Sequence, residues 1–290
     1  MSFIGLVSDS TPGLSDDYVA QHENLRVVPL YLKMGDDTLR DGVDIKGDEF
    51  YQRLPQMSTL PTTSQPSAGD FQTCYQELVN AGASGIVSIH LSSGISGTIN
   101  SATLARQEID VPVEIVDTQS AAASHMLAVE AAQRAILSGA SLEEVAAVAK
   151  KVAEQQRIVF AVETLEYLYK GGRIGGAAAL VGSLLQMKPL LYFKDGRIDA
   201  LEKVRTSKRA LGRMVDLMGE WLDGQGPLEV MVMHAAAPDR AEELAAAVQK
   251  NLSVASMRTV LVPPVLGAHC GPGALGLCCC PASALGKNGG

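Results

Sequence analysis

Short apolar runs alternate along the chain with longer segments that repeat at the period of an α-helix. Runs such as Gly85–Leu91 carry apolar residues on both faces, which is typical of strands covered by helices on two sides. From Leu142 to Val152 apolar residues recur at helical spacing, after a capping box formed by Ser141 and Glu144. This alternation predicts an α/β fold with mainly parallel sheets. The predicted strands are Phe3–Ser8, Val27–Leu32, Gly85–Leu91, Val113–Asp117, Ile158–Val162, Pro189–Phe193, Leu228–His234 and Arg258–Val262.

The length of 290 residues predicts about two domains, because ~150 residues are typical of one domain. A boundary fits near Gln156–Thr164, and no linker rich in Pro, Gly or Ser marks it. We therefore expect two packed lobes, over residues 1–160 and 161–284, followed by a short tail over residues 285–290.

Composition excludes several classes of protein. With 24 Lys and Arg against 32 Asp and Glu, the net charge of −8 disfavours a nucleic-acid partner. Hydrophobic residues make up 47%, which disfavours disorder, and no uninterrupted apolar run reaches the ~18 residues of a membrane span. The N-terminus lacks the pattern of a signal peptide, and the odd count of five cysteines favours reduced thiols and a cytoplasmic location. Cys278–Cys280 lack metal-ligand spacing, so we expect a buried apolar strand there and no metal site.

Polar loops follow or precede the predicted strands, and ligands in such sheets bind at the carboxyl ends of the strands. Hydroxyl-rich loops occur at Ser8–Thr11 and Pro61–Ser67, and both are also compatible with ordinary turns and helix caps. The loop Leu91–Thr98 is glycine-rich and precedes a predicted helix. Its glycines permit close approach of the backbone, and the free N–H groups of the helix suit a carboxylate or phosphate.

Two later loops each carry one candidate residue. Arg173 lies in a glycine-flanked turn after a predicted helix, where it binds an anion or a partner, or is simply solvated. His269 lies in a loop crowded with Gly and Pro, so the backbone and not helix packing positions it; a structural role is the alternative. The other histidines have no evident partner in the sequence.

Five motifs in order resemble the DegV family of bacterial lipid-binding proteins, some of which are the fatty-acid-binding subunits of fatty acid kinase. The motifs are TTSQPS (62–67), SSGISGT (92–98), LEYLYKGGRIGG (165–176), KPLLYFKDGRI (188–198) and GAHCGPG (267–273). The resemblance runs from Val7 to Gly276. It implies a DegV (EDD-like) α/β fold in which one long-chain fatty acid, of the palmitate, stearate or oleate class, lies between the two lobes. It implies no cofactor.

The resemblance also implies roles for individual residues. Thr62 or Thr63 holds the fatty acid carboxylate together with Ser93 and the adjacent Gly94. Arg173, Arg205 and His269 lie near the carboxylate and the surface that docks the kinase. The catalytic subunit of a fatty acid kinase, a separate protein, would phosphorylate the bound carboxylate, so this chain is expected to be a carrier without catalytic residues. Transient contact with a membrane surface is compatible with this role.

The sequence is compatible with two other functions. Ser93, His269 and a carboxylate such as Asp9 or Asp117 are the residue types of a hydrolase triad, although the GxSxG elbow is absent. The chain is also compatible with a regulatory protein that senses a lipid. For a carrier, the tail would dominate affinity, since burying a methylene yields roughly 0.8 kcal/mol. The segments Ala177–Leu185 and Pro189–Phe193 are candidates for the wall of an acyl tunnel, or for ordinary core.

Overall fold

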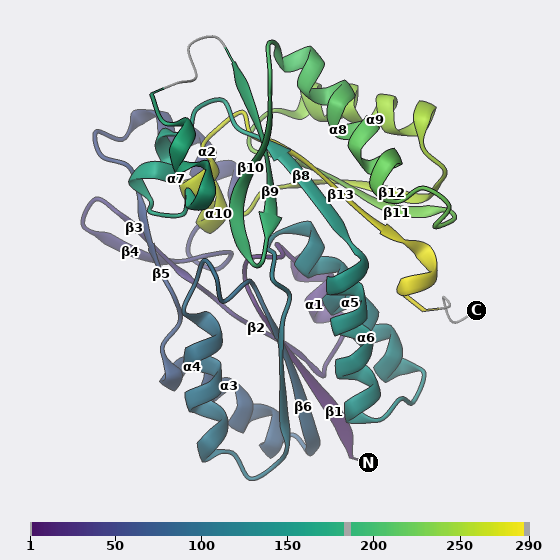
Figure 1. The fold of residues 1–290 in the computed structure, drawn as a ribbon. Helices are drawn as coiled ribbons and strands as arrows, with labels where there is room; N and C mark the ends of the chain where they lie inside the picture. The colour runs from purple at the N-terminus through teal and green to yellow at the C-terminus, as the bar shows by residue number, and fades with distance from the viewer. Residues whose placement is uncertain (1, 183–186, 287–290) are drawn as a thin grey trace.

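The computed structural model describes residues 2–182 and 187–286 (Figure 1). Its first sheet has four parallel strands in the order β2-β1-β6-β7. These strands are β1 (Phe3–Asp9), β2 (Leu25–Val28), β6 (Ala83–His90) and β7 (Val113–Asp117). Their carboxyl ends point toward the second sheet, so the loops that follow β1, β6 and β7 lie at the centre of the molecule (Figure 1).

Helices cover both faces of the first sheet, as the apolar pattern predicts. Alternate strand residues point to opposite faces, so Val7 packs toward one pair of helices and Leu6 toward the other. The capping box of Ser141 and Glu144 is present at the start of α6, and Val145 lies on its buried face. The two pairs are α3 (Ala68–Asn80) with α4 (Thr98–Ala105), and α5 (Ala123–Leu137) with α6 (Leu142–Gln155).

The second sheet has six strands in the order β10-β9-β8-β13-β11-β12. Only β11 and β12 pair in parallel; the other four pairs are antiparallel. The α/β class and a parallel sheet are confirmed, but the expectation of parallel strands is wrong for most of this sheet. The strands are β8 (Arg157–Ala161), β9 (Lys188–Lys194), β10 (Arg197–Val204), β11 (Leu228–His234), β12 (Val254–Leu261) and β13 (Leu275–Pro281).

Local turn chemistry explains part of this difference. β9 and β10 are joined by Asp195 and Gly196, which both have positive φ and form the two-residue turn of an antiparallel hairpin. β13 comes from the end of the chain and inserts between β8 and β11, antiparallel to both. It contains Cys278–Cys280, which are fully buried and unpaired, so the predicted apolar strand is confirmed.

The two sheets share a hydrophobic core. One face of the second sheet packs on α8 (Ser207–Trp221) and α9 (Pro238–Asn251). The other face belongs to a larger cluster that also contains Leu6 and the inner faces of α5 and α6. The predicted lobes are residues 1–160 and 161–284. Strand β8 belongs to the second sheet, so a division of the chain by its sheets falls before Arg157 instead. Leu285 is buried, and residues 287–290 of the predicted tail lie outside the described residues.

A third, small sheet has the order β4-β3-β5. The predicted strand Val27–Leu32 is therefore wrong as a single strand: it divides at Pro29 and Leu30 between β2 and β3. Pro29 has no N–H for a ladder, and the N–H of Leu30 donates to the hydroxyl of Ser10. The remaining elements are β3 (Tyr31–Met34), β4 (Asp37–Arg40), β5 (Thr62–Ser64), α1 (Asp16–Ala20), α2 (Gly47–Arg53), α7 (Glu166–Lys170), α10 (Pro264–Cys270) and the 3₁₀ turns Leu54–Gln56, Arg106–Glu108, Gly175–Leu180 and Ala282–Ala284.

Over residues 2–182 and 187–286, no helix is long and apolar enough to cross a bilayer. In the same residues, no group of three or more His, Cys, Asp or Glu side chains is arranged to hold a metal ion.

Candidate functional site

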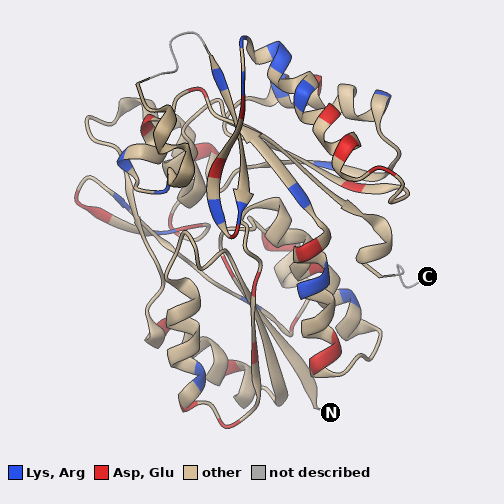
Figure 2. Cartoon of the chain, viewed as in Figure 1, with Lys and Arg blue, Asp and Glu red and all other residues tan. Residues whose placement is uncertain are grey.

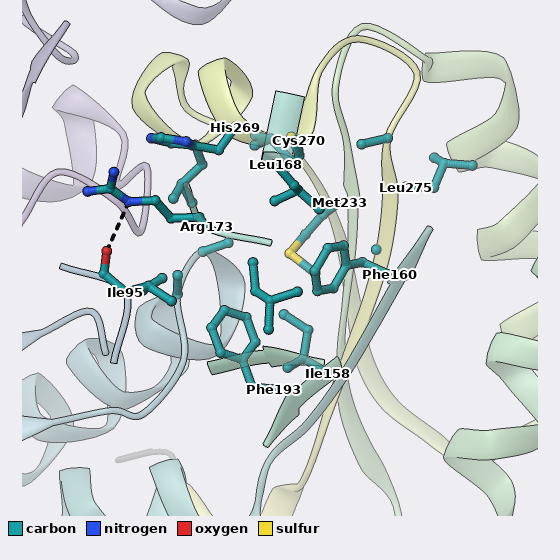
Figure 3. A pocket seen from close by; sticks show the side chains of 17 residues that line it. Ile95, Ile158, Phe160, Leu168, Arg173, Phe193, Met233, His269, Cys270 and Leu275 are labelled. Carbon is teal, nitrogen blue, oxygen red and sulfur yellow. Dashed lines mark hydrogen bonds between the residues drawn. The ribbon is translucent and has the colours of Figure 1, made fainter. Parts of the chain in front are cut away.

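An apolar cavity lies between the inner face of the second sheet and the loops at the carboxyl edge of the first (Figure 3). It has about 670 Å³ of space free of atoms, part of which is open to solvent. The second sheet contributes Ile158, Phe160, Phe193, Ile198 and Met233; α7 and α10 contribute Leu168, Leu266 and Cys270; and the loops of the first sheet contribute Ile95, Ala121 and Ala122.

The lining of the cavity is almost entirely apolar, and residues with charged or imidazole groups lie at one side of it only. Of the described residues that line it, only Arg173 and His269 carry charged or imidazole groups, and Figure 3 shows the two side chains next to each other. Arg173 follows Gly172, whose φ of 69° turns the chain away from α7. Its Nε donates to the carbonyl of Ile95 at 3.2 Å, and its Nη1 donates to the carbonyl of Gly171 at 2.9 Å. The predicted cation therefore joins the cavity to the loop that contains Ser93.

His269 lies in the last turn of α10, so the prediction that a loop and not a helix positions it is wrong. Burial, and then the charge of Arg173, lower its pKa from 6.5 to about 4, so the ring is neutral near pH 7. Its Nε2 lies 2.7 Å from the Oγ1 of Thr63, whereas its Nδ1 is buried and has no hydrogen-bond partner among the described residues. A Cβ on Gly171 would overlap Nδ1, so glycine at this position leaves room for the ring. An N–H without an acceptor is costly to bury, which favours the proton on Nε2.

The geometry distinguishes between the two predicted threonines. Neighbouring residues of a strand point to opposite faces, and on β5 it is Thr63 that faces His269, while Thr62 is exposed. With the proton on Nε2, His269 donates to the Oγ1 of Thr63. The hydroxyl hydrogen of Thr63 is then free to be donated to an anion at the polar side of the cavity.

The loop after β6 contains Ser93 and Gly94. The hydroxyl of Ser93 is exposed and donates to the carboxylate of Asp117 at 2.5 Å. The preceding Ser92 donates to the carbonyl of Gly196 at 2.6 Å, which holds the loop against the β9–β10 turn. A Cβ on Gly94 would lie 2.5 Å from that same carbonyl oxygen, so this contact requires glycine. Ser93 is thus two residues from Ile95, which lines the cavity.

Arg205 is not near these residues. It follows the end of β10 opposite to Gly196, and eight residues of strand span roughly 26 Å. Together with Lys208, Arg209 and Arg213 it lines a separate surface hollow, and Figure 2 shows basic residues gathered at the start of α8. The structure therefore does not place Arg205 at the head-group end of the cavity.

Hydrogen bonds do not join Ser93, His269 and a carboxylate into the possible hydrolase triad. Ser93 is bonded to Asp117, and His269 is bonded to Thr63, so neither Ser–His nor His–Asp pairing is made. Asp9 is fully buried and accepts hydrogen bonds from the N–H groups of Thr11 and Leu91. The segment Ser8–Thr11 is thus the buried end of β1 with the turn after it, and Asp9 holds the end of β6.

Comparison with known proteins decides the family. The family model described as "Uncharacterised protein, DegV family" matches residues 3–282. The chain belongs to the DegV family. A DegV domain-containing protein from Streptomyces coelicolor is 38% identical over 275 residues, which cover 94% of this chain and 97% of the relative.

Solved DegV structures have the same fold. A Thermus thermophilus DegV family protein, described by its fatty acid binding, is 34% identical with a TM-score of 0.91 and covers 96% of this chain and 99% of its own. DegV of Bacillus subtilis, a fatty acid binding protein, is 31% identical with a TM-score of 0.87 over 97% and 99%. A stearic-acid-binding protein from Eubacterium ventriosum is 28% identical with a TM-score of 0.87 over 97% and 98%. The predicted family and fold class are therefore confirmed, and proteins of this family bind fatty acids.

Several contacts of this DegV protein were not predicted from its sequence. Asp41 accepts a hydrogen bond from the N–H of Val265 at 3.1 Å and so caps α10, which carries His269. Gly171 of the KGGR motif makes room for the His269 ring. Of the predicted tunnel walls, Pro189–Phe193 contributes Phe193. The described part of Ala177–Leu185 contributes no lining residue, and Ser183–Leu185 lies outside the described residues.

Proposed function

We propose that this DegV protein binds one long-chain fatty acid, with its acyl tail in the apolar cavity and its carboxylate at the polar side. The observation that carries the proposal is the asymmetry of the cavity, which is apolar except for Arg173 and His269. Thr63 and Ser93 donate hydroxyl hydrogen bonds to the carboxylate, and Arg173 supplies the positive charge. For Ser93 this requires its hydroxyl to turn away from Asp117.

The energetics of such a ligand divide between tail and head. An acyl chain of about 16 carbons gains on the order of 10 kcal/mol when its methylenes leave water. Each charge-assisted hydrogen bond to the carboxylate adds about 1.5–3 kcal/mol to the binding free energy. A carboxylate buried without such partners would weaken binding, because it loses its hydration. The tail therefore sets most of the affinity, while Thr63, Ser93 and Arg173 fix the position of the head group.

Mass spectrometry of an organic extract of the purified protein tests this proposal directly. We expect a co-purifying fatty acid, and stoichiometric binding of added fatty acid by the delipidated protein. A protein that carries no fatty acid and binds none would refute the proposal.

We further propose that the bound fatty acid is presented in the cytoplasm to the catalytic subunit of a fatty acid kinase, which phosphorylates its carboxylate. The predicted docking surface includes Arg173 and the separate basic surface at Arg205. The substitution Arg205→Glu is the cleaner test, because Arg205 is remote from the cavity. We expect loss of acyl-phosphate formation by the kinase with unchanged fatty acid binding. Unchanged phosphorylation would remove Arg205 from the docking surface.

A further inference from the structure

One part of the cavity wall lies where the pairing of strands β8 and β9 ends. The two strands pair at Ala161↔Leu190, Phe160↔Leu191 and Val159↔Tyr192, and the pairing ends there. Both strands continue, β8 back to Arg157 and β9 on to Lys194. Ile158 and Phe193 would be the next pair, but no ladder joins them.

Ile158 and Phe193 line two hollows at once. They line the cavity, on the side away from His269 and Cys270 (Figure 3), and they also line a surface groove. The groove is further lined by Tyr192, Leu201 and Trp221, which are all partly exposed. The two side chains therefore separate the end of the cavity from the surface groove. The groove has an apolar part, formed by Tyr192, Leu201 and Trp221, and a polar part that includes Gln119, Glu154 and Arg157.

Strand β10 is irregular a few residues further along, opposite Leu190 and Leu191. The register of β10 against β9 shifts between Ala200 and Glu202, so Leu201 has no direct partner on β9. Leu201 lines the groove instead. An apolar side chain is thus presented to the groove beside Tyr192 and Trp221.

We propose that the methyl end of a long acyl chain passes between Ile158 and Phe193 and lies in this groove against Tyr192, Leu201 and Trp221. The inference rests on the proposed fatty acid binding and specifies its substrate class: chains longer than the closed cavity holds. The methyl end is favoured over a carboxylate because the carboxylate of Glu154 lines the groove beside Arg157, and Arg157 also has carbonyl partners. The Nη1 of Arg157 donates to the carbonyls of Glu154 and Gln156, each at 2.8 Å.

Trp221 is the single tryptophan of the chain and gives a direct test. Bromine quenches tryptophan fluorescence at short range, so brominated fatty acids report where each end of the chain lies. We expect a long acid brominated at its methyl end to quench Trp221. The same acid brominated beside its carboxylate, and a short acid brominated at its methyl end, should leave the fluorescence unchanged.

The outcomes separate this inference from the function on which it rests. If the acids bind in calorimetry but bromine at the methyl end of the long acid fails to quench, the groove is not occupied and the inference is overturned. Equal quenching by short and long acids overturns it as well. If no acid binds, the proposed function itself has failed.

Two substitutions at Ile158 test the passage in opposite directions. Ile158→Phe narrows the gap, and Ile158→Val widens it. In the wild type, affinity should keep rising by about two- to fourfold per added methylene after the cavity is full, fourfold being equivalent to about 0.8 kcal/mol. We expect this rise to stop at a shorter chain in Ile158→Phe and to persist in Ile158→Val. A uniform loss of affinity at every chain length in Ile158→Phe would contradict the proposed passage.

Discussion

The substitution Thr63→Val tests which hydroxyl holds the head group. Valine keeps the branched shape that suits β5 but removes the oxygen that lies 2.7 Å from the Nε2 of His269. Thr62→Val is the matched control, because Thr62 is the neighbouring residue of the same strand and is exposed on the other face.

The size of the expected effect follows from the bond that is lost. A hydrogen bond to a carboxylate contributes about 1.5–3 kcal/mol, which corresponds to roughly 10- to 150-fold in Kd. The tail interactions, on the order of 10 kcal/mol, are unchanged by the substitution. Thr63→Val should therefore weaken fatty acid binding without abolishing it, and Thr62→Val should leave the Kd nearly unchanged.

Calorimetric titration of the delipidated proteins measures this effect, with two ligands of equal length. One is a fatty acid, and the other is the corresponding fatty alcohol, which fills the cavity but carries no charge. Thr63→Val should weaken the acid much more than the alcohol, since a neutral hydrogen bond is worth only about 0.5–1.5 kcal/mol. An equal loss for acid and alcohol would show that the substitution damages the cavity. A loss in Thr62→Val as large as in Thr63→Val would refute the assignment of the head group to Thr63.

Three further predictions concern stability. Gly94→Ala should lower the free energy of unfolding by about 1–3 kcal/mol in denaturant titrations, because its Cβ meets the carbonyl of Gly196; Gly212→Ala, in the open on helix α8, should instead stabilise the protein by up to about 1 kcal/mol. Burial lowers the pKa of His125 from 6.5 to about 4, so the unfolded chain binds more protons than the folded chain between these pH values. The free energy of unfolding therefore falls by about 3 kcal/mol as the pH drops from 6.5 to 4. His125→Gln should flatten the accompanying fall in melting temperature, and an unchanged dependence of melting temperature on pH would contradict this. Burial raises the pKa of Asp41 from 3.8 to about 7, so the protonated form that stabilises the folded chain is lost as the pH rises through 7. Asp41→Asn should therefore raise the melting temperature, relative to wild type, more above about pH 7 than below about pH 4. An equal change in melting temperature in both pH ranges would count against this prediction.

The apolar pattern predicted which segments are strands better than it predicted their directions. Strands with apolar residues on both faces are typical of parallel sheets, but any strand between two helix layers has the same pattern. Leu228–His234 is such a strand, and it pairs in parallel with β12 and antiparallel with β13. Direction in this sheet depends on the distant insertion of β13. The Asp195–Gly196 turn was the one local signal for an antiparallel hairpin.

The sequence identified the loops of the candidate site but not the contacts between them. His269 and Arg173 were predicted from loops rich in glycine, and both line the cavity. Thr62 and Thr63 were indistinguishable because the face of a three-residue strand depends on its register with β3, which pairs Thr63 with Leu32. Arg205 was assigned as the Arg that follows the KPLLYFKDGRI motif, and a position in the sequence contains no information on distance along an extended hairpin.

The charges at the polar side of the cavity bear on how firmly a carboxylate would be held. Because His269 is neutral near pH 7, Arg173 is the only cation among the described lining residues. Its Nε and Nη1 already donate to the carbonyls of Ile95 and Gly171, so its capacity to hold a ligand is partly used. Asp117, which accepts from Ser93, competes with the ligand for that hydroxyl. Such a head-group site would orient a carboxylate without surrounding it with charge, which would suit the proposed carrier, whose ligand must remain open to a second protein.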